Sequence, residues 1–117
     1  VIEKTVELVR NSSYTHRYLF CVGEYTAATA RIFLNAGYKI QGILDNNELL
    51  KGSYLGGLKV YTPSLFSTKT KTELAKIIVI VCNERSDIYL EIVNQLKELG
   101  LKETQVLHKV FNGNNAS

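Results

Sequence analysis

Residues 76–82 read Lys-Ile-Ile-Val-Ile-Val-Cys, and every side chain after the lysine is apolar. Most of these residues are β-branched, which favours an extended strand. A strand with apolar side chains on both faces needs cover above and below, because neither face tolerates water. The segment therefore predicts a buried strand of a parallel sheet with helices on both sides, the arrangement of an α/β domain.

The rest of the chain alternates between short apolar runs and segments with helical spacing of apolar residues. Further strands are predicted at residues 18–22, 39–44, 58–61 and 105–108. Helices are predicted at residues 2–11, 25–36, 64–67 and 86–99. Two segments are predicted to be loops: the glycine-containing residues 52–57, and the threonine-rich stretch with Lys69, Lys71 and Lys76.

This order predicts a three-layer, Rossmann-like α/β fold with a leading N-terminal helix. Right-handed crossovers favour a parallel sheet with strand order 3-2-1-4-5. We expect a leading helix and linker over residues 1–16, one domain over residues 17–111, and a flexible tail over residues 112–117. The chain begins with Val1 and contains no methionine. We therefore expect it to be a piece of a larger protein.

Composition narrows the class of protein. The 117 residues carry 14 Lys+Arg and 11 Asp+Glu, a net charge of +3. Because the basic residues are scattered, we expect no nucleic-acid partner. The longest apolar run is far shorter than the ~20 residues that span a bilayer, so no membrane span is expected. Cys21 and Cys82 occur without a secretory signal, which predicts reduced thiols in the cytoplasm.

The candidate ligand site lies where the strand order reverses, at the carboxyl ends of the first and fourth strands. Gly23 follows the first strand, at the position of the first glycine in Gly-x-Gly-x-x-Gly. In that alignment Tyr25 replaces the second glycine, Ala28 replaces the third, and Glu24 adds a negative charge. The alternative is that Gly23 only makes a turn.

Asp45 lies 22 residues after Gly23, at the end of the second strand. A carboxylate at this position bonds a ribose hydroxyl in nucleotide-binding folds. The alternative is that Asp45 caps a turn together with Asn46.

The segment Asn83-Glu84-Arg85-Ser86 follows the fourth strand and opens a helix. The amides at the start of that helix and the guanidinium of Arg85 could hold a phosphate. The alternative is that Ser86 and Asp87 only cap the helix. The sequence shows no nucleophile with its base, no P-loop and no zinc spacing, so we expect no catalysis by this chain alone and no metal site.

Four strings in this order resemble a known family: Leu19-Phe20-Cys21-Val22-Gly23, Gly42-Ile43-Leu44-Asp45-Asn46-Asn47, Gly57-Leu58-Lys59-Val60-Tyr61-Thr62-Pro63 and Val81-Cys82-Asn83-Glu84-Arg85. They are similar to the Rossmann-like N-terminal domain of bacterial sugar N- and O-acetyltransferases, such as the sialic-acid O-acetyltransferase type. Related domains occur in nucleotide-sugar epimerase/dehydratases and beside sugar methyltransferases and glycosyltransferases. The resemblance covers about residues 17–107.

The resemblance implies a pocket for the nucleotide part of a UDP-sugar. Gly23 and its turn would face the phosphates, Asp45 and Asn46 would contact uridine or ribose, and three residues would line the other side: Asn83, Glu84 and Arg85. Two departures matter. The turn reads Glu24-Tyr25-Thr26 in place of a second glycine and a small polar residue, and the catalytic β-helix of the acetyltransferases does not occur in this sequence.

The sequence thus predicts a nucleotide- or nucleotide-sugar-binding domain of a larger protein of bacterial surface-glycan biosynthesis, with a transferase as the parent. Its expected partners are the small-molecule ligand and the other domains of the parent chain. One alternative is the NAD-binding part of a nucleotide-sugar epimerase/dehydratase. Another is a structural module without a ligand that packs against a methyltransferase or glycosyltransferase domain, with Tyr25 filling the pocket.

Overall fold

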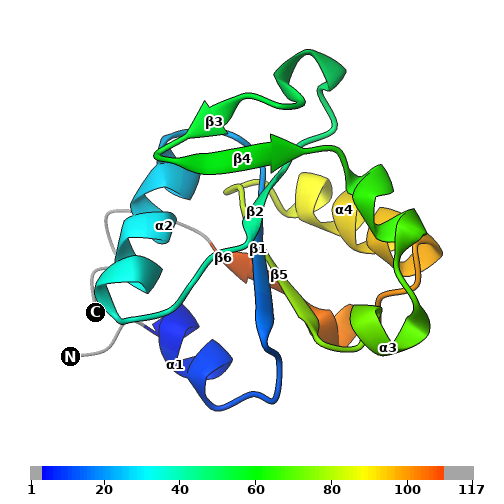
Figure 1. The fold of residues 1–117 in the computed structure, drawn as a ribbon, viewed down its shortest axis with the longest axis horizontal. Helices are drawn as coiled ribbons and strands as arrows, with labels where there is room; N and C mark the ends of the chain where they lie inside the picture. Colours follow the sequence, from blue (N-terminus) through cyan, green and yellow to red (C-terminus); the bar gives the residue numbers. More distant parts are fainter. Residues whose placement is uncertain (1–3, 110–117) are drawn as a thin grey trace.

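The computed structural model describes residues 4–109 and shows a six-stranded sheet between two layers of helices (Figure 1). The strand order is β3-β4-β2-β1-β5-β6. In chain order the strands are β1 (His16–Phe20), β2 (Gly42–Leu44), β3 (Tyr54–Leu55), β4 (Leu58–Tyr61), β5 (Ile77–Cys82) and β6 (Val106–Lys109). The helices are α1 (Lys4–Arg10), α2 (Glu24–Asn35), α3 (Lys71–Leu74) and α4 (Ser86–Glu98), with 3-10 turns η1 (Glu48–Leu50), η2 (Pro63–Thr68) and η3 (Glu103–Gln105).

The predicted parallel core is confirmed. The sheet runs β4-β2-β1-β5-β6 in parallel, which is the order 3-2-1-4-5 when only the parallel strands are counted. Every residue of β5 is buried, as its apolar sequence predicts. Because β2 and β5 flank β1 on opposite sides, the chain reverses its direction of winding at β1. This reversal creates a crevice at the carboxyl ends of β1 and β5.

The loop prediction for residues 52–57 is wrong. Tyr54–Leu55 forms β3, which pairs antiparallel with β4. Gly56 and Gly57 connect the two strands with φ values of 57° and 81°. Two successive residues with positive φ make the two-residue turn that matches the twist of a hairpin. The Gly-Gly pair is therefore a hairpin signal, and β3 adds an antiparallel edge to the sheet.

The threonine-rich stretch is also more ordered than predicted. Thr70 and Glu73 form a reciprocal capping box, in which each side chain accepts a hydrogen bond from the other residue's backbone N–H. The box starts the short helix α3, because it satisfies backbone donors that have no partner inside the helix. Leu74 then anchors the helix in the core.

The core is divided by the sheet into two clusters. On one face, α1 and α2 cover β1, β2 and β5; on the other, η2, α3 and α4 cover the same strands (Figure 1). The leading helix is part of the first layer, since Val6 and Val9 are buried against the sheet. Residues 1–3 of the predicted leading segment, and the whole predicted tail at 112–117, lie outside the described residues. No helix within residues 4–109 is long and apolar enough to span a membrane.

Candidate functional site

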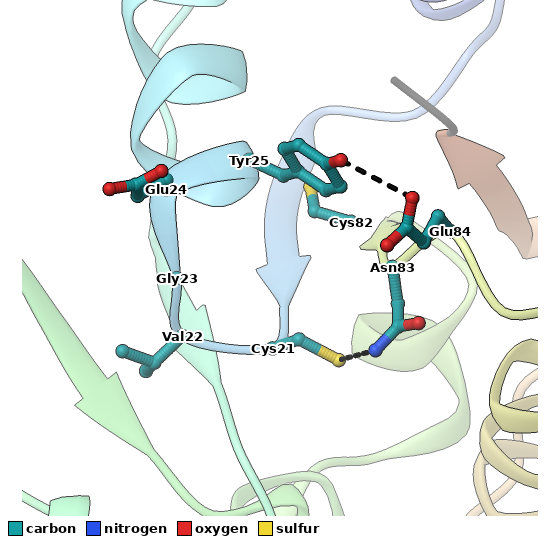
Figure 2. A pocket seen from close by; sticks show the side chains of 8 residues that line it. All are labelled: Cys21, Val22, Gly23, Glu24, Tyr25, Cys82, Asn83 and Glu84. Atoms are coloured by element: carbon teal, nitrogen blue, oxygen red, sulfur yellow. Dashed lines mark hydrogen bonds between the residues drawn. The ribbon is translucent and has the colours of Figure 1, made fainter. Parts of the chain in front are cut away.

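A cavity of about 360 Å³ opens at the carboxyl edge of the sheet, at the predicted crevice between β1 and β5 (Figure 2). Two segments line it, the turn between β1 and α2 and the loop between β5 and α4. The lining residues are Cys21, Val22, Gly23, Glu24, Tyr25, Cys82, Asn83 and Glu84. Six of the nine predicted site residues are thus near one another: five line the cavity, and Thr26 is buried and donates a hydrogen bond to the lining residue Cys21.

Cys21 makes the sharp turn that ends β1. Its φ is 83°, the one positive value among the non-glycine residues of the described range. Its backbone N–H donates to the carbonyl of Leu44 at 2.8 Å, which holds the turn against the end of β2. A left-handed residue cannot continue an extended strand, so β1 ends at Phe20 instead of at Val22 as predicted.

Gly23 does not make the tight turn that the sequence predicted for it. It is the N-cap of α2 with an extended φ of 163°, so the turn does not depend on a glycine there. A Cβ atom at Gly23 would meet nothing within 4 Å. Counted from the left-handed turn at Cys21, Gly23 stands at the second position of the Gly-x-Gly-x-x-Gly spacing, with Cys21 and Thr26 in place of the other two glycines. The alignment that made Gly23 the first glycine is therefore shifted by two residues.

Thr26 takes the third position in the corrected alignment, in place of Ala28. Its side chain is fully buried, and its hydroxyl donates to the carbonyl of Cys21. This contact draws the first turn of α2 close to the end of β1, which is the packing role of a third glycine. A threonine can take this place because its hydroxyl finds a partner there.

Tyr25 does not block the start of α2. Figure 2 shows its ring directed away from Gly23, toward the loop after β5. Its hydroxyl donates to Oε2 of Glu84 at 3.3 Å. The Glu84 carboxylate raises the pKa of Tyr25, so the phenol remains protonated at neutral pH. The pair bridges the two lining segments at one side of the cavity and leaves the backbone at Gly23 open.

The two cysteines contribute sulfur atoms to the cavity wall. The amide of Asn83 approaches Sγ of Cys21 at 4.0 Å. Burial raises the pKa of each thiol to about 11, against an ordinary value of 9.0. Cys21 packs with the core cluster beside α4 and Cys82 with the cluster beside α2. Both thiols are therefore protonated at neutral pH and are weak nucleophiles.

Asp45 lies beside the turn but does not line the cavity. Its Oδ2 accepts from the backbone N–H of Val22 and its Oδ1 from that of Asn47, each at 2.8 Å. The turn-capping role is therefore present. Each carboxylate oxygen keeps a further lone pair for another donor.

Asn46 is turned away from this turn. Its side-chain amide exchanges two hydrogen bonds with that of Gln95 on α4, at 3.0 and 2.7 Å.

Arg85, which was predicted to contact a phosphate, forms an ion pair with Asp87. Its guanidinium donates twice to the carboxylate of Asp87, at 3.2 and 2.6 Å, and the side chains are exposed. Asp87 thus pairs with Arg85, and the N-cap of α4 is Arg85 itself, without a side-chain cap. The guanidinium is not among the groups that line the cavity.

His108 supports one wall of the cavity, although no sequence pattern links it to the site. Its Nε2 lies 2.5 Å from the carbonyl of Asn83, and its ring stacks on Tyr89 with the centroids 4.4 Å apart. The contact arises because β6 places His108 beside Val81 of β5. Only the sheet register reveals it. Within residues 4–109 no cluster of three or more His, Cys, Asp or Glu side chains could hold a metal ion.

The fold is that of Rossmann-like proteins. A Rex-family repressor matches with a TM-score of 0.61 and 14% identity over 95% of this chain. UDP-D-quinovosamine 4-dehydrogenase from Vibrio fischeri matches with a TM-score of 0.64 and 16% identity, covering 87% of this chain and 82% of that one. The same repressor has been solved with β-NADH and with β-NAD⁺ and operator DNA. This chain spans about three fifths of the repressor, 59% of its length. No protein-family model matches the sequence, and no curated protein matches it.

Proposed function

We propose that this chain is a nucleotide-binding domain in which the ligand's diphosphate lies against Gly23 and its ribose contacts Asp45. The observation that carries the proposal is the open space at Gly23, where an added Cβ would meet nothing within 4 Å. Gly23 is the N-cap of a 12-residue helix. The first amides of a helix point outward without intrahelical partners, and the helix dipole favours an anion there.

The side chains that line the site are acidic, so backbone amides would have to provide most of the binding to a phosphate. Glu24 and Glu84 line the cavity, and the guanidinium of Arg85 is already paired with Asp87. A phosphate bound here would gain little from basic side chains and would be repelled by the two carboxylates. We therefore expect modest affinity that improves with ionic strength, because salt screens this repulsion.

Asp45 is well placed for a ribose. Its bond to the N–H of Val22 fixes the carboxylate next to the turn that would hold the diphosphate. Vicinal hydroxyls can donate to the lone pairs that the Val22 and Asn47 amides leave open. Such an acidic residue follows the glycine turn by about 20 residues in dinucleotide-binding folds.

The ligand we favour is a UDP-sugar, and the alternative is NAD. Both carry a diphosphate and a ribose, so the same turn can accept either. The resemblance to the N-terminal domains of sugar acetyltransferases supports the UDP-sugar, and it favours a parent protein of surface-glycan biosynthesis. The likeness to a repressor solved with β-NAD⁺ supports the alternative. In either case we propose that other domains of a larger parent protein carry out the chemistry on the bound ligand.

The test is calorimetric titration of UDP, UDP-N-acetylglucosamine and NAD⁺ into the wild-type chain and into Gly23→Val. The new side chain enters open space and should leave the fold intact, but it occupies the place of the diphosphate. We expect binding to weaken by tenfold or more, about 1.4 kcal/mol. Asn35→Val, at the exposed far end of α2, is the matched control and should bind like the wild type.

Each outcome has a distinct meaning. Binding of NAD⁺ without UDP selects the dinucleotide alternative. Absence of binding by all three ligands at millimolar concentration overturns the proposal, and the structural-module interpretation then replaces it. Equal affinities of wild type and Gly23→Val would show that the nucleotide binds elsewhere.

A further inference from the structure

A second cavity, of about 230 Å³, lies at the opposite edge of the sheet, where β1 and β5 begin. It is separate from the nucleotide site, which lies at the carboxyl ends of the same strands. Its lining residues come from the first residues of β1 and β5 and from the segment around α3. They are His16, Tyr18, Lys69, Glu73, Lys76 and Ile77.

Tyr18 provides a polar group at the floor of this cavity. The residue is only 6% exposed, and its ring packs edge-on against Phe66 with the centroids 5.2 Å apart. Its hydroxyl makes no hydrogen bond to any residue in the 4–109 range. In that range no side-chain oxygen or nitrogen is fully buried without a partner, so the hydroxyl keeps some exposed surface, and Tyr18 is one of the residues that line this cavity. Burial raises the pKa of Tyr18, which keeps the hydroxyl available as a donor.

The cavity rim carries two lysines whose charge is only partly balanced. Neither Lys69 nor Lys76 forms an ion pair within the part of the chain that the structure describes, where the one salt bridge joins Arg85 to Asp87. Glu73 is the one carboxylate of the lining, and one of its oxygens is held by the backbone N–H of Thr70 at 2.9 Å. That hydrogen bond lowers the pKa of Glu73, and the two lysines contribute in the same direction.

His16 adds a further polar group. Its Nδ1 is 2.8 Å from the hydroxyl of Thr15, which leaves the other ring nitrogen free of partners within residues 4–109. The lining therefore combines two ammonium groups, an imidazole and an uncommitted phenol against one carboxylate. This excess of donors and positive charge suits an anion. The volume is several times the ~30 Å³ that one water molecule occupies, so it admits a small polyatomic ion.

We propose that this cavity binds a small phosphate or carboxylate anion, with the Tyr18 hydroxyl donating to it from the floor and Lys69 and Lys76 neutralising it at the rim. The site depends on neither Gly23 nor Asp45. It gives the domain a second ligand at the edge of the sheet remote from the nucleotide. Free phosphate and a metabolite's carboxylate share this chemistry, and separate titrations with phosphate and acetate distinguish them.

The test is a titration of the full chain with inorganic phosphate, and separately with acetate, followed by amide chemical shifts at constant ionic strength with chloride as the reference. We expect saturating shifts at the amides of Tyr18, Lys69 and Lys76. Tyr18→Phe removes only the hydroxyl, so the fold should remain, and affinity should fall about tenfold for the lost hydrogen bond to a charged group. Lys69→Gln should weaken binding as well.

Lys71→Gln is the matched control, since Lys71 belongs to the same basic segment but does not line the cavity. Its affinity for phosphate should equal that of the wild type. Shifts that rise linearly without saturation would overturn the proposal. So would equal weakening by Lys71→Gln and Lys69→Gln, because that would indicate diffuse attraction to a basic surface. Failure here leaves the nucleotide proposal untouched, because its variants and its ligands are different.

Discussion

The carboxylate of Asp45 accepts a hydrogen bond from the backbone N–H of Val22 at 2.8 Å, which ties the end of β2 to the turn after β1. The same carboxylate accepts from the N–H of Asn47. Asp45 therefore holds two loops in place before any ligand arrives. A residue with this role affects both the stability of the fold and the shape of the candidate site.

Replacement of Asp45 by alanine should destabilise the chain as well as weaken nucleotide binding. From the sequence, Asp45→Ala is expected to weaken nucleotide binding without unfolding the chain, because Asp45 caps an exposed loop. The two amide contacts change that expectation. Loss of the bond from Val22 should cost about 1.5–3 kcal/mol of unfolding free energy, because a hydrogen bond to a charged group is lost and the amide has no other partner among residues 4–109. Urea denaturation measures the change.

Asp87→Asn is the control for this substitution. It removes one exposed carboxylate whose partner, Arg85, is equally exposed. Exposed ion pairs contribute little, so the change in unfolding free energy should stay below about 1 kcal/mol. Equal losses in Asp45→Ala and Asp87→Asn would mean that the Asp45 contacts do not stabilise the turn.

Cys21 offers a test of the turn itself. Its φ of 83° is strained for an L-residue, so Cys21→Gly should be more stable than Cys21→Ala by about 1 kcal/mol. At Cys82, inside β5, the order should reverse. Extended backbone there gives glycine no advantage, and its larger loss of entropy on folding disfavours it by about 0.5–1 kcal/mol. Thermal unfolding of the four variants measures both differences. The same order at both positions would contradict a left-handed turn at Cys21.

Much of the fold could be predicted because the strongest signals were local. The apolar run of β5 and the helical periodicity of α4 each specify an element and its buried face. The alternation of strands and helices then limits the topology. The strand β3 was missed because two residues carry too little periodicity, and only the Gly56-Gly57 turn indicates it.

Most residues of the candidate site come together at one edge of the sheet, as the sequence predicted, but the sequence did not indicate how the turn after β1 is built. The sequence motif was aligned on glycine, but the residue with left-handed backbone in this turn is Cys21. No pattern of residue types could indicate that Cys21 would accept this conformation. The pairing of Arg85 with Asp87 and the support of Asn83 by His108 depend on rotamers and sheet register, which a linear sequence does not specify.

The thiols should react slowly and in a pH-dependent way. Burial raises the pKa of Cys21 from 9.0 to about 11, partly offset by the Asn83 amide. At pH 8 its thiolate should be roughly a hundredfold scarcer than that of a free cysteine, and alkylation by iodoacetamide correspondingly slower. The rate should rise about tenfold per pH unit up to pH 10. Mass spectrometry of the alkylated protein at each pH measures this, and a rate equal to that of a small thiol would contradict it.

The raised pKa values of the two thiols also make the stability of the fold depend on pH. The folded state binds the thiol protons more tightly than the unfolded state, so this contribution to stability is complete below pH 9 and declines as the pH rises toward 11. Unfolding free energies at pH 8 and pH 9.5 should therefore differ more in the wild type than in Cys82→Ala. An identical decline in both proteins would assign the pH dependence to other groups.

Glycine has different roles at Gly42, where the chain is closely packed, and at Gly23, where space is open. At Gly42 a Cβ would lie 2.6 Å from Cε2 of Tyr61 and 3.1 Å from the carbonyl oxygen of Lys59, so Gly42→Ala must displace the ring or the strand. We expect a loss of about 1–3 kcal/mol, as in other overpacked cores. In Gly23→Ala the new methyl group meets no atom within 4 Å. Alanine restricts the unfolded backbone, which stabilises the fold, but it is a weaker N-cap than glycine, and the two effects roughly cancel. The unfolding free energy of Gly23→Ala should therefore change by less than about 0.5 kcal/mol.

Urea denaturation of the two variants measures this difference, and nucleotide titration adds the decisive comparison. Gly42→Ala should lose stability yet bind nucleotide with unchanged affinity under conditions where it is folded, because Gly42 does not line the cavity. Gly23→Ala should keep its stability and lose affinity, because its methyl group enters the space proposed for the diphosphate. If Gly23→Ala instead loses as much stability as Gly42→Ala, then Gly23 is needed for the turn itself and the open space beside it no longer indicates a ligand.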